Sequence, residues 1–336
     1  MPVKQVWQIW QMWQALLSSL LLLALVGFAL SQEPLPKLQD KQQPEKKPEE
    51  KVEEKPDDPI SPILVDTSVV VLNVTVTDFG ENFVGGLKRS DFAILEDKFP
   101  QPIADFSVEV KPFAAAILID ASASMGDKMT LARSACTSFV DGLREDDVFA
   151  IYSFTGTKVK QVQDFSDIHD ISDFLWDMRP DGMTPMYDAL VKATEDLLKR
   201  PERRRVILLV SDGADSTSKA TLDEVIRKAT DVGITIYCVD LSDRGVYKTT
   251  PRDNGPEIMK NLAQKTGGRF YTSPGGGALR EAFAQTVEEL RHQYTITYEP
   301  RNEKKDGKWR AVEVQLKNPA LKARTRLGYY AAKAKK

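Results

Sequence analysis

Five oxygen-bearing side chains stand where predicted strands end or predicted helices begin, and together they could hold a metal ion. In AAAILIDASASMG an apolar run ends in Asp120, which is followed by Ser122 and Ser124. Thr184 lies before a predicted helix in DGMTPMYDAL, and Asp212 ends the apolar run RVILLVSD. Carboxylate and hydroxyl oxygens are hard ligands, which favour Mg²⁺, Mn²⁺ or Ca²⁺ over zinc or copper. These residue types therefore point to binding of a hard divalent cation.

The segment that must position these side chains, residues 112–290, alternates between buried strands and amphipathic helices. Near-continuous apolar runs of this kind are typical of parallel strands covered on both faces. The pattern predicts an α/β fold with a doubly wound, mostly parallel sheet flanked by helices. Ligands of such sheets bind beyond the carboxyl ends of the strands, so we expect the five side chains at that edge. The runs are AAAILID, DVFAIYSF, RVILLVSD and ITIYCVDL.

Strand-like segments precede and follow this central region. Residues 63–111 contain SVVVLNVTVTD, in which apolar and polar residues alternate, and FAILEDKFPQPIADFSVEV, which reads as two strands around a proline-containing turn. Residues 291–336 contain QYTITYEP, WRAVEVQLK and RTRLGYYA, followed by a basic tail. Because an isolated hairpin is only marginally stable, we expect the two flanks to pair into one small β-sandwich.

The first 62 residues predict export rather than a folded domain. In residues 1–31 an apolar stretch ends in a small-x-small sequence, which indicates a secretory signal peptide. The alternative is an uncleaved N-terminal anchor with tryptophans at the membrane interface. Residues 32–62 are rich in Lys, Glu, Asp, Gln and Pro and predict a disordered linker. We expect a periplasmic, envelope or secreted protein that contacts a membrane only if the first segment is retained.

The order D-x-S-x-S, then a threonine in G-x-T-P-x-Y-D-A, then S-D-G resembles the von Willebrand factor type A domain and its metal-ion-dependent adhesion site. The phrases GLKRSDFAILEDKFPQPIADF, QYTITYEP and RLGYYA are similar to those of its bacterial exported subfamily, often called VWFA-related. The resemblance implies direct coordination by Ser122 and Ser124, and by Thr184 in the ligand-competent state. Asp120 and Asp212 would mainly hold metal-bound waters, or bind the metal directly as the site rearranges.

The resemblance also implies a partner. The remaining coordination position would take an Asp or Glu side chain from another protein, bound through Mg²⁺, or through Mn²⁺ or Ca²⁺. In some relatives the last helix shifts on ligand binding; here that helix would be REAFAQTVEELRHQ, which leads directly into a strand of the sandwich.

Two hypotheses of different class follow. The first is an exported, metal-dependent adhesion or scaffold module. The second is a structural component of an envelope assembly, whose β-sandwich makes the contacts and whose metal site is not used. The net charge of -3 gives no sign of nucleic-acid binding. Neither His169 nor His292 stands in a recognisable catalytic motif, so we expect no enzyme.

Four further residues have simpler interpretations. Asp215 and Asp240 fall near the same sheet edge, where we interpret them as solvated loop carboxylates. Cys136 lies on a predicted helix and Cys238 in a predicted strand. We expect both cysteines to be buried and unpaired.

Overall fold

A computed structural model describes residues 69–108, 111–212, 215–242, 254–272 and 276–333. The chain divides into two units, Met1–Ile63 and Leu64–Lys336, and every described residue belongs to the second. The predicted signal or anchor segment and the charged linker lie outside the described residues. In the described part of the chain, no helix is long and apolar enough to cross a membrane.

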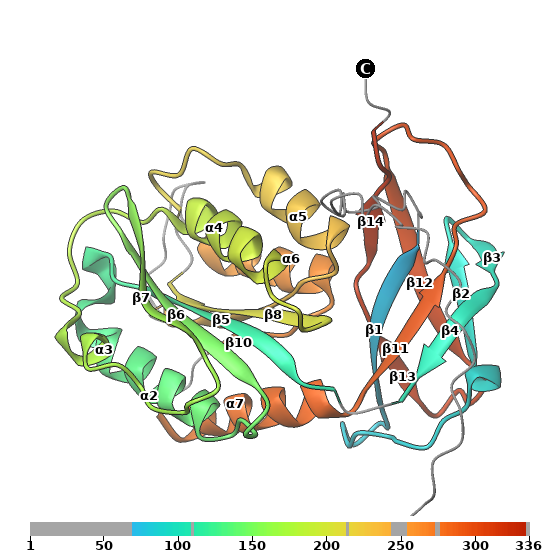
Figure 1. Ribbon diagram of the computed structural model, residues 1–336, viewed down its shortest axis with the longest axis horizontal. Coiled ribbons are helices and arrows are strands. Elements are labelled where there is room, and N and C mark those ends of the chain that lie inside the picture. Colours follow the sequence, from blue (N-terminus) through green and yellow to red (C-terminus); the bar gives the residue numbers. More distant parts are fainter. Residues whose placement is uncertain (1–68, 109–110, 213–214, 243–253, 273–275, 334–336) are drawn as a thin grey trace, which may run out of the picture. The chain divides into compact units, whose positions relative to one another are not determined.

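A six-stranded sheet, in the order β10-β9-β8-β5-β6-β7, forms the centre of the α/β part (Figure 1). Neighbouring strands are parallel, except that β7 pairs antiparallel with β6 at one edge. From β5 the chain adds β6 and β7 on one side and then returns to place β8 on the other, so β5 and β8 flank the switch point of the sheet. The strands are β5 Phe113–Asp120, β6 Val148–Thr155, β7 Lys158–Ser166, β8 Arg204–Ser211, β9 Thr235–Asp240 and β10 Phe270–Thr272.

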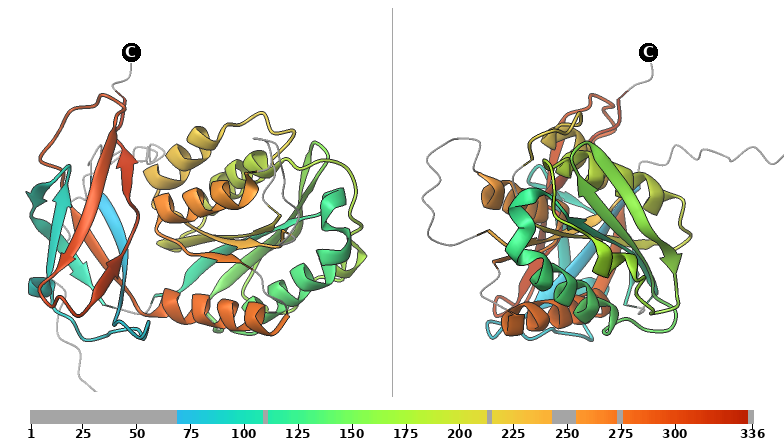
Figure 2. Two further views of the ribbon diagram at one scale, coloured as in Figure 1. Left: turned by 180° about the vertical axis from the view of Figure 1, so that it is seen from behind. Right: turned by 90° about the vertical axis from the view of Figure 1, so that its left-hand side faces the viewer.

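Helices cover both faces of this sheet, which explains why β5 is buried along its whole length. Ile117 and Ile119 pack with the side chains of α2 and α7, whereas Ala116 and Leu118 pack with those of α4, α5 and α6. Figure 2 shows the helices on the two sides of the sheet. The predicted doubly wound α/β fold is thus confirmed. The helices are α2 Met129–Val140, α3 Phe174–Asp177, α4 Met186–Leu198, α5 Leu222–Asp231, α6 Gly255–Thr266 and α7 Gly276–Arg291, with 3-10 turns η1 Arg89–Asp91 and η2 Ala123–Lys128.

The predicted β-sandwich is also present, and both flanks of the chain contribute to each of its sheets. One sheet has the order β13-β1-β11-β4 and the other β14-β12-β2-β3. Leu72 and Val74 of β1 are fully buried against Ile296 of β11 and Ile94 of β2. The strands are β1 Val70–Thr77, β2 Phe92–Glu96, β3 Phe99–Gln101, β4 Ile103–Ser107, β11 Gln293–Tyr298, β12 Trp309–Leu316, β13 Lys322–Arg324 and β14 Gly328–Tyr330.

The segment FAILEDKFPQPIADFSVEV forms three strands, so the prediction of two strands around a proline-containing turn was wrong. The chain reverses at Asp97 and Lys98, which both adopt positive φ angles of 49° and 71°. Pro100 instead lies inside β3. A proline is tolerated there because β3 is the last strand of its sheet.

A buried ion cluster around Glu289 fastens the end of α7 to the sandwich. One carboxylate oxygen of Glu289 accepts hydrogen bonds from Tyr237 Oη at 2.7 Å and Thr75 Oγ1 at 3.4 Å, and it is paired with Arg324. The other accepts from Arg269 Nε at 2.8 Å. Since Tyr237 lies in β9, Thr75 in β1 and Arg324 in β13, one side chain of α7 joins the α/β sheet to two sandwich strands.

Replacing Glu289 by Gln is expected to lower the free energy of unfolding by about 3 kcal/mol, because two arginines lose their buried counter-charge. Chemical denaturation of the full chain measures this change. The neighbouring Glu288→Gln variant is a matched control, since the Glu288 side chain is 52% exposed. It should change stability by less than about 0.5 kcal/mol. Equal effects of the two variants would contradict this role of the ion cluster around Glu289.

Candidate metal-binding site

The strand ends of β5 and β8 place two carboxylates beside each other. Asp120 is the last residue of β5, and Asp212 directly follows the last residue of β8. The two strands are parallel neighbours, with Ile119 opposite Val210. Both carboxylates therefore lie at the carboxyl edge of the sheet, at its switch point, as expected from the sequence.

Asp120 is completely buried and is held by two hydrogen bonds. Its Oδ1 accepts from the Ser122 backbone N–H at 2.8 Å, and its Oδ2 accepts from Ser211 Oγ at 2.5 Å. Burial raises the pKa of Asp120 to about 6, and the nearby charge of Asp212 acts in the same direction. The hydrogen bonds from Ser211 and Ser122 oppose this rise. The site therefore favours a positive charge beside Asp120.

Two hydroxyls follow Asp120 in the loop and face each other. Ser122 is buried and precedes the 3-10 turn η2, whereas Ser124 lies within that turn and is exposed. Their Oγ atoms are 3.1 Å apart. Two oxygens bound side by side to an octahedral Mg²⁺, each at about 2.1 Å, would lie about 3 Å apart. The serine pair thus has the spacing of two adjacent ligands.

The loop before α4 brings Thr184 to the same edge. Its backbone is tied to the β5 loop by hydrogen bonds from Asp181 N to Ala121 O at 2.9 Å and from Ala123 N to Gly182 O at 3.0 Å. Thr184 is also tied to the segment after β8, because its N–H donates to Ser216 Oγ at 2.9 Å. Three loops that carry the five predicted residues are therefore joined by hydrogen bonds.

Asp212 has spare bonding capacity. Its side chain is 3% exposed, and Oδ1 has no hydrogen-bond partner among the described residues. Its Oδ2 lies 3.7 Å from Lys128 Nζ. In the described part of the chain, Lys128 is the one cation paired with either Asp120 or Asp212. A buried carboxylate oxygen without a partner is costly, and a bound cation would remove that cost.

These donors fit a hard divalent cation. Where the chain is described, no three His, Cys, Asp or Glu side chains gather closely enough to hold a metal, so a cation here would depend on the hydroxyls as well as the carboxylates. An all-oxygen set with only two carboxylates suits Mg²⁺, which retains several waters. The coordination itself stays a prediction.

Asp215 and Asp240 have structural roles that their sequence context did not reveal. Asp215 Oδ1 accepts from the Tyr187 backbone N–H at 3.1 Å and from Ser218 Oγ at 2.6 Å, which caps the start of α4. Asp240 ends β9, is 6% exposed, and accepts from the Ser242 N–H at 2.8 Å. The interpretation of Asp240 as solvated was wrong, and Asp215 is only partly exposed.

The histidines and cysteines take no part in this cluster. His169 lies 3.4 Å from the Asp147 carbonyl, and His292 stacks on Phe83 with ring centroids 5.4 Å apart. Cys136 and Cys238 are both buried and free, as predicted. The described residues thus offer no histidine or cysteine next to the five oxygen donors.

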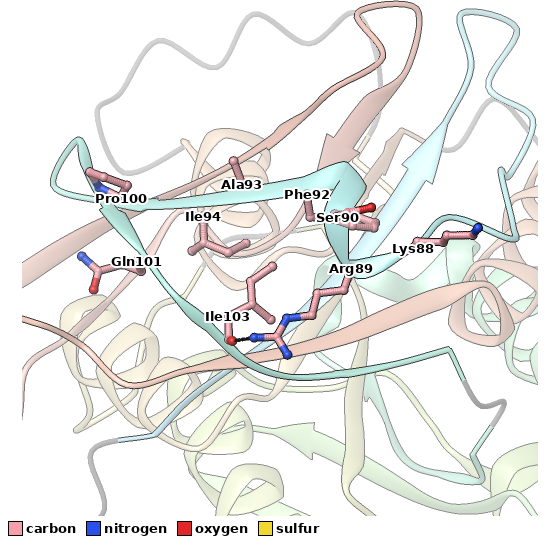
Figure 3. Close-up of a pocket in the computed structure, with 9 residues that line it drawn as sticks. All are labelled: Lys88, Arg89, Ser90, Phe92, Ala93, Ile94, Pro100, Gln101 and Ile103. Atoms are coloured by element: carbon pink, nitrogen blue, oxygen red, sulfur yellow. Dashed lines mark hydrogen bonds between the residues drawn. The ribbon is translucent and has the colours of Figure 1, made fainter.

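A concave feature lies on the β-sandwich. It is a groove of about 650 Å³ lined by residues of β2, β3 and β4 and of the turn before them (Figure 3). The Arg89 guanidinium donates a hydrogen bond to the Ile103 carbonyl across it. Pro100 and Pro102 lack an N–H, which opposes the pairing of an added strand at this edge.

Two neighbours of the site were missed by sequence reasoning. The sequence did contain a signal for Ser211 as a neighbour of the site. Ser211 directly precedes Asp212 in SDG at the end of a strand, where successive side chains alternate in direction. Lys128 gave no such signal, since its reach back to Asp212 depends on the 3-10 turn η2.

The raised pKa of Asp120 predicts a stability change with pH in the cation-free protein. Because the folded-state pKa of about 6 lies above the ordinary 3.8, this group's contribution to stability is lost as pH rises from about 4 through about 6. Urea denaturation in the presence of a chelator measures the free energy of unfolding at pH 5 and at pH 7. The gain in this free energy from pH 7 to pH 5 should be about 1 kcal/mol larger for wild type than for Asp120→Asn. The same pH dependence in wild type and variant would contradict this environment for Asp120.

Comparison with known proteins agrees with this architecture. The family model for the von Willebrand factor type A domain matches residues 116–285, half of the chain. A search of curated proteins gave no match. Similar solved structures include a von Willebrand factor type A protein from Catenulispora acidiphila, with 14% identity, a TM-score of 0.47, and coverage of 81% of this chain and 75% of that one.

Two further similar structures cover different shares of the chain. The pilus adhesin SpaC from Lactobacillus rhamnosus GG is 11% identical, with a TM-score of 0.45 and coverage of 76% of this chain and 49% of that one. An aerotolerance-related membrane protein from Bacteroides fragilis is 16% identical, with a TM-score of 0.43 and coverage of 53% and 99%. On the strength of the family match over half of its length, this chain belongs to the von Willebrand factor type A domain family.

Proposed function

We propose that this protein is an exported protein-binding module that engages an Asp or Glu side chain of a partner through a divalent cation, Mg²⁺ or alternatively Mn²⁺ or Ca²⁺. The cation would be held by Asp120, Ser122, Ser124, Thr184 and Asp212. Family membership supports an interaction module. The observation that carries the cation's part in the proposal is the buried Oδ1 of Asp212, which has no hydrogen-bond partner among the described residues and lies beside the buried carboxylate of Asp120.

The proposed roles of these residues differ according to their burial. Asp120 and Asp212 are buried and supply negative charge from beneath, whereas Ser124 is exposed and faces an approaching partner. When bound, the cation would supply positive charge at a position open to a carboxylate. Hydrogen bonds between the three loops hold the donors in place before a partner arrives, which limits the entropy lost on binding.

Exposed apolar side chains near the same edge support a protein as the partner. Met183 immediately precedes Thr184 and is 55% exposed, and Phe174 and Trp176 of α3 are 57% and 49% exposed. Lys160 lies over the Phe174 ring, 4.9 Å from its centroid, and pairs in the sheet with Ser153, near the end of β6. This contact holds α3 close to the carboxyl edge. Exposed apolar groups in such a setting are typical of interaction surfaces.

The proposal extends to location and chemistry. Export rests on the sequence of residues 1–31, and it places the protein in the periplasm, in the cell envelope or outside the cell, with an uncleaved segment serving as an anchor if it is retained. Catalysis forms no part of the proposed function, and neither does nucleic-acid binding.

Two immobilised peptide pools provide the test, one with a central Asp or Glu and the other with Asn or Gln at the same position. The full chain should bind the acidic pool in Mg²⁺ and lose that binding in chelator. Substituting Ser122→Ala and Ser124→Ala together should weaken binding at least about tenfold, because both candidate ligands are removed.

Ser138→Ala is the matched control for the serine variant. Ser138 lies on α2, where its hydroxyl donates to the Ser134 carbonyl within the helix, and binding should be unchanged. Binding to the acidic pool that survives chelation, or equal capture by both pools, would contradict the proposal. Such a result would favour contacts made by the β-sandwich.

A further inference from the structure

We propose that Lys128 is the resident counter-ion of this site. In the cation-free protein its ammonium group neutralises Asp212, and it has to move away when a divalent cation binds, so Lys128 sets the affinity of the site for its cation. This inference rests on the proposed function, because it concerns the same five donors, and it adds a residue that regulates them.

The position of Lys128 is fixed by the turn that presents the serines. Ser122 directly precedes η2, Ser124 lies within it, and Lys128 is its last residue. From there the side chain reaches back across the site, so that Nζ lies 3.7 Å from Asp212 Oδ2. One short turn therefore carries Ser124, one of the candidate hydroxyl ligands, together with the ammonium group that pairs with Asp212, and Ser122 directly precedes it.

Burial strengthens the interaction between the Lys128 ammonium group and Asp212. The Lys128 side chain is 13% exposed and that of Asp212 is 3% exposed, so water screens their interaction only weakly. Asp120, fully buried beside them, adds a second carboxylate. With both acids ionised, the site carries two negative charges and one positive charge. The positive charge lowers the affinity of the site for a metal ion.

Lysine is suited to leaving such a site. Its charge sits on a flexible four-carbon stem, so the ammonium can swing into solvent without moving the backbone of η2. A divalent cation next to Asp212 and an ammonium group at its present distance would repel each other strongly in this poorly screened setting. Cation binding and the Lys128–Asp212 contact are therefore in competition.

Calorimetric titration of Mg²⁺ alone into the full chain tests this competition. Lys128→Gln should bind Mg²⁺ at least about tenfold more tightly than wild type, because the competing charge is gone. Lys128→Arg, which keeps the charge, should remain within about threefold of wild type, well short of the effect of removing that charge. Lys158→Gln removes an exposed lysine from the β6–β7 hairpin at the same edge and should leave the affinity unchanged.

A second measurement uses the wild-type protein and needs no variant. Lysine acylation followed by peptide mass spectrometry should modify Lys128 slowly in chelator and faster in saturating Mg²⁺, whereas Lys158 should react at the same rate in both. An unchanged rate at Lys128 would overturn the proposal, even if the Gln variant failed to fold.

The outcomes separate this inference from the function on which it rests. If wild type and Lys128→Gln bind Mg²⁺ with equal affinity, or the variant binds more weakly, the role of Lys128 is wrong while the metal site stands. If neither protein gives saturable heat and both are folded, the metal site itself is wrong and the counter-ion role falls with it.

Discussion

Two carboxylates buried next to each other at one edge of a sheet are the constraint around which this molecule is arranged. Asp120 and Asp212 are both almost inaccessible to water, and their charges repel. Such a pair is tolerated only where hydrogen-bond donors and positive charge are supplied. Ser211, the Ser122 N–H and Lys128 supply part of this. Oδ1 of Asp212 has no hydrogen-bond partner in the described part of the chain, and under the proposed function a divalent cation would supply the remaining positive charge.

The sandwich is joined to the α/β part of the fold at the end of α7. Glu289 ties the end of α7 to β1 and β13 of the sandwich and to β9 of the α/β sheet. Arg204, at the start of β8, donates to the Leu290 carbonyl at 2.9 Å and so caps the same helix end. A shift of α7 on partner binding would have to break these contacts or carry the sandwich with it. The joint between the two parts of the fold is therefore built from charge as well as from apolar packing.

Periodicity made the framework predictable, whereas contacts between loops did not follow from it. The apolar run ending in Asp120 had to be a buried parallel strand, and the switch point then placed Asp212 beside it. The antiparallel strand β7 was missed because its residues are mostly half-exposed and polar. The turn at Asp97 and Lys98 was misplaced because Pro100 and Pro102 gave a stronger local signal. Lys128 was missed because a side chain's reach across a 3-10 turn has no sequence period.

Anomalous scattering from crystals of the full chain grown with Mn²⁺ tests the central claim most directly. The account predicts a single strong peak at the carboxyl edge of the α/β sheet, with Ser122 Oγ and Ser124 Oγ both about 2 Å from the ion. It also predicts Lys128 Nζ further from Asp212 than the present 3.7 Å. A well-ordered structure with no peak at this edge, or with the ion held by other residues, would contradict it.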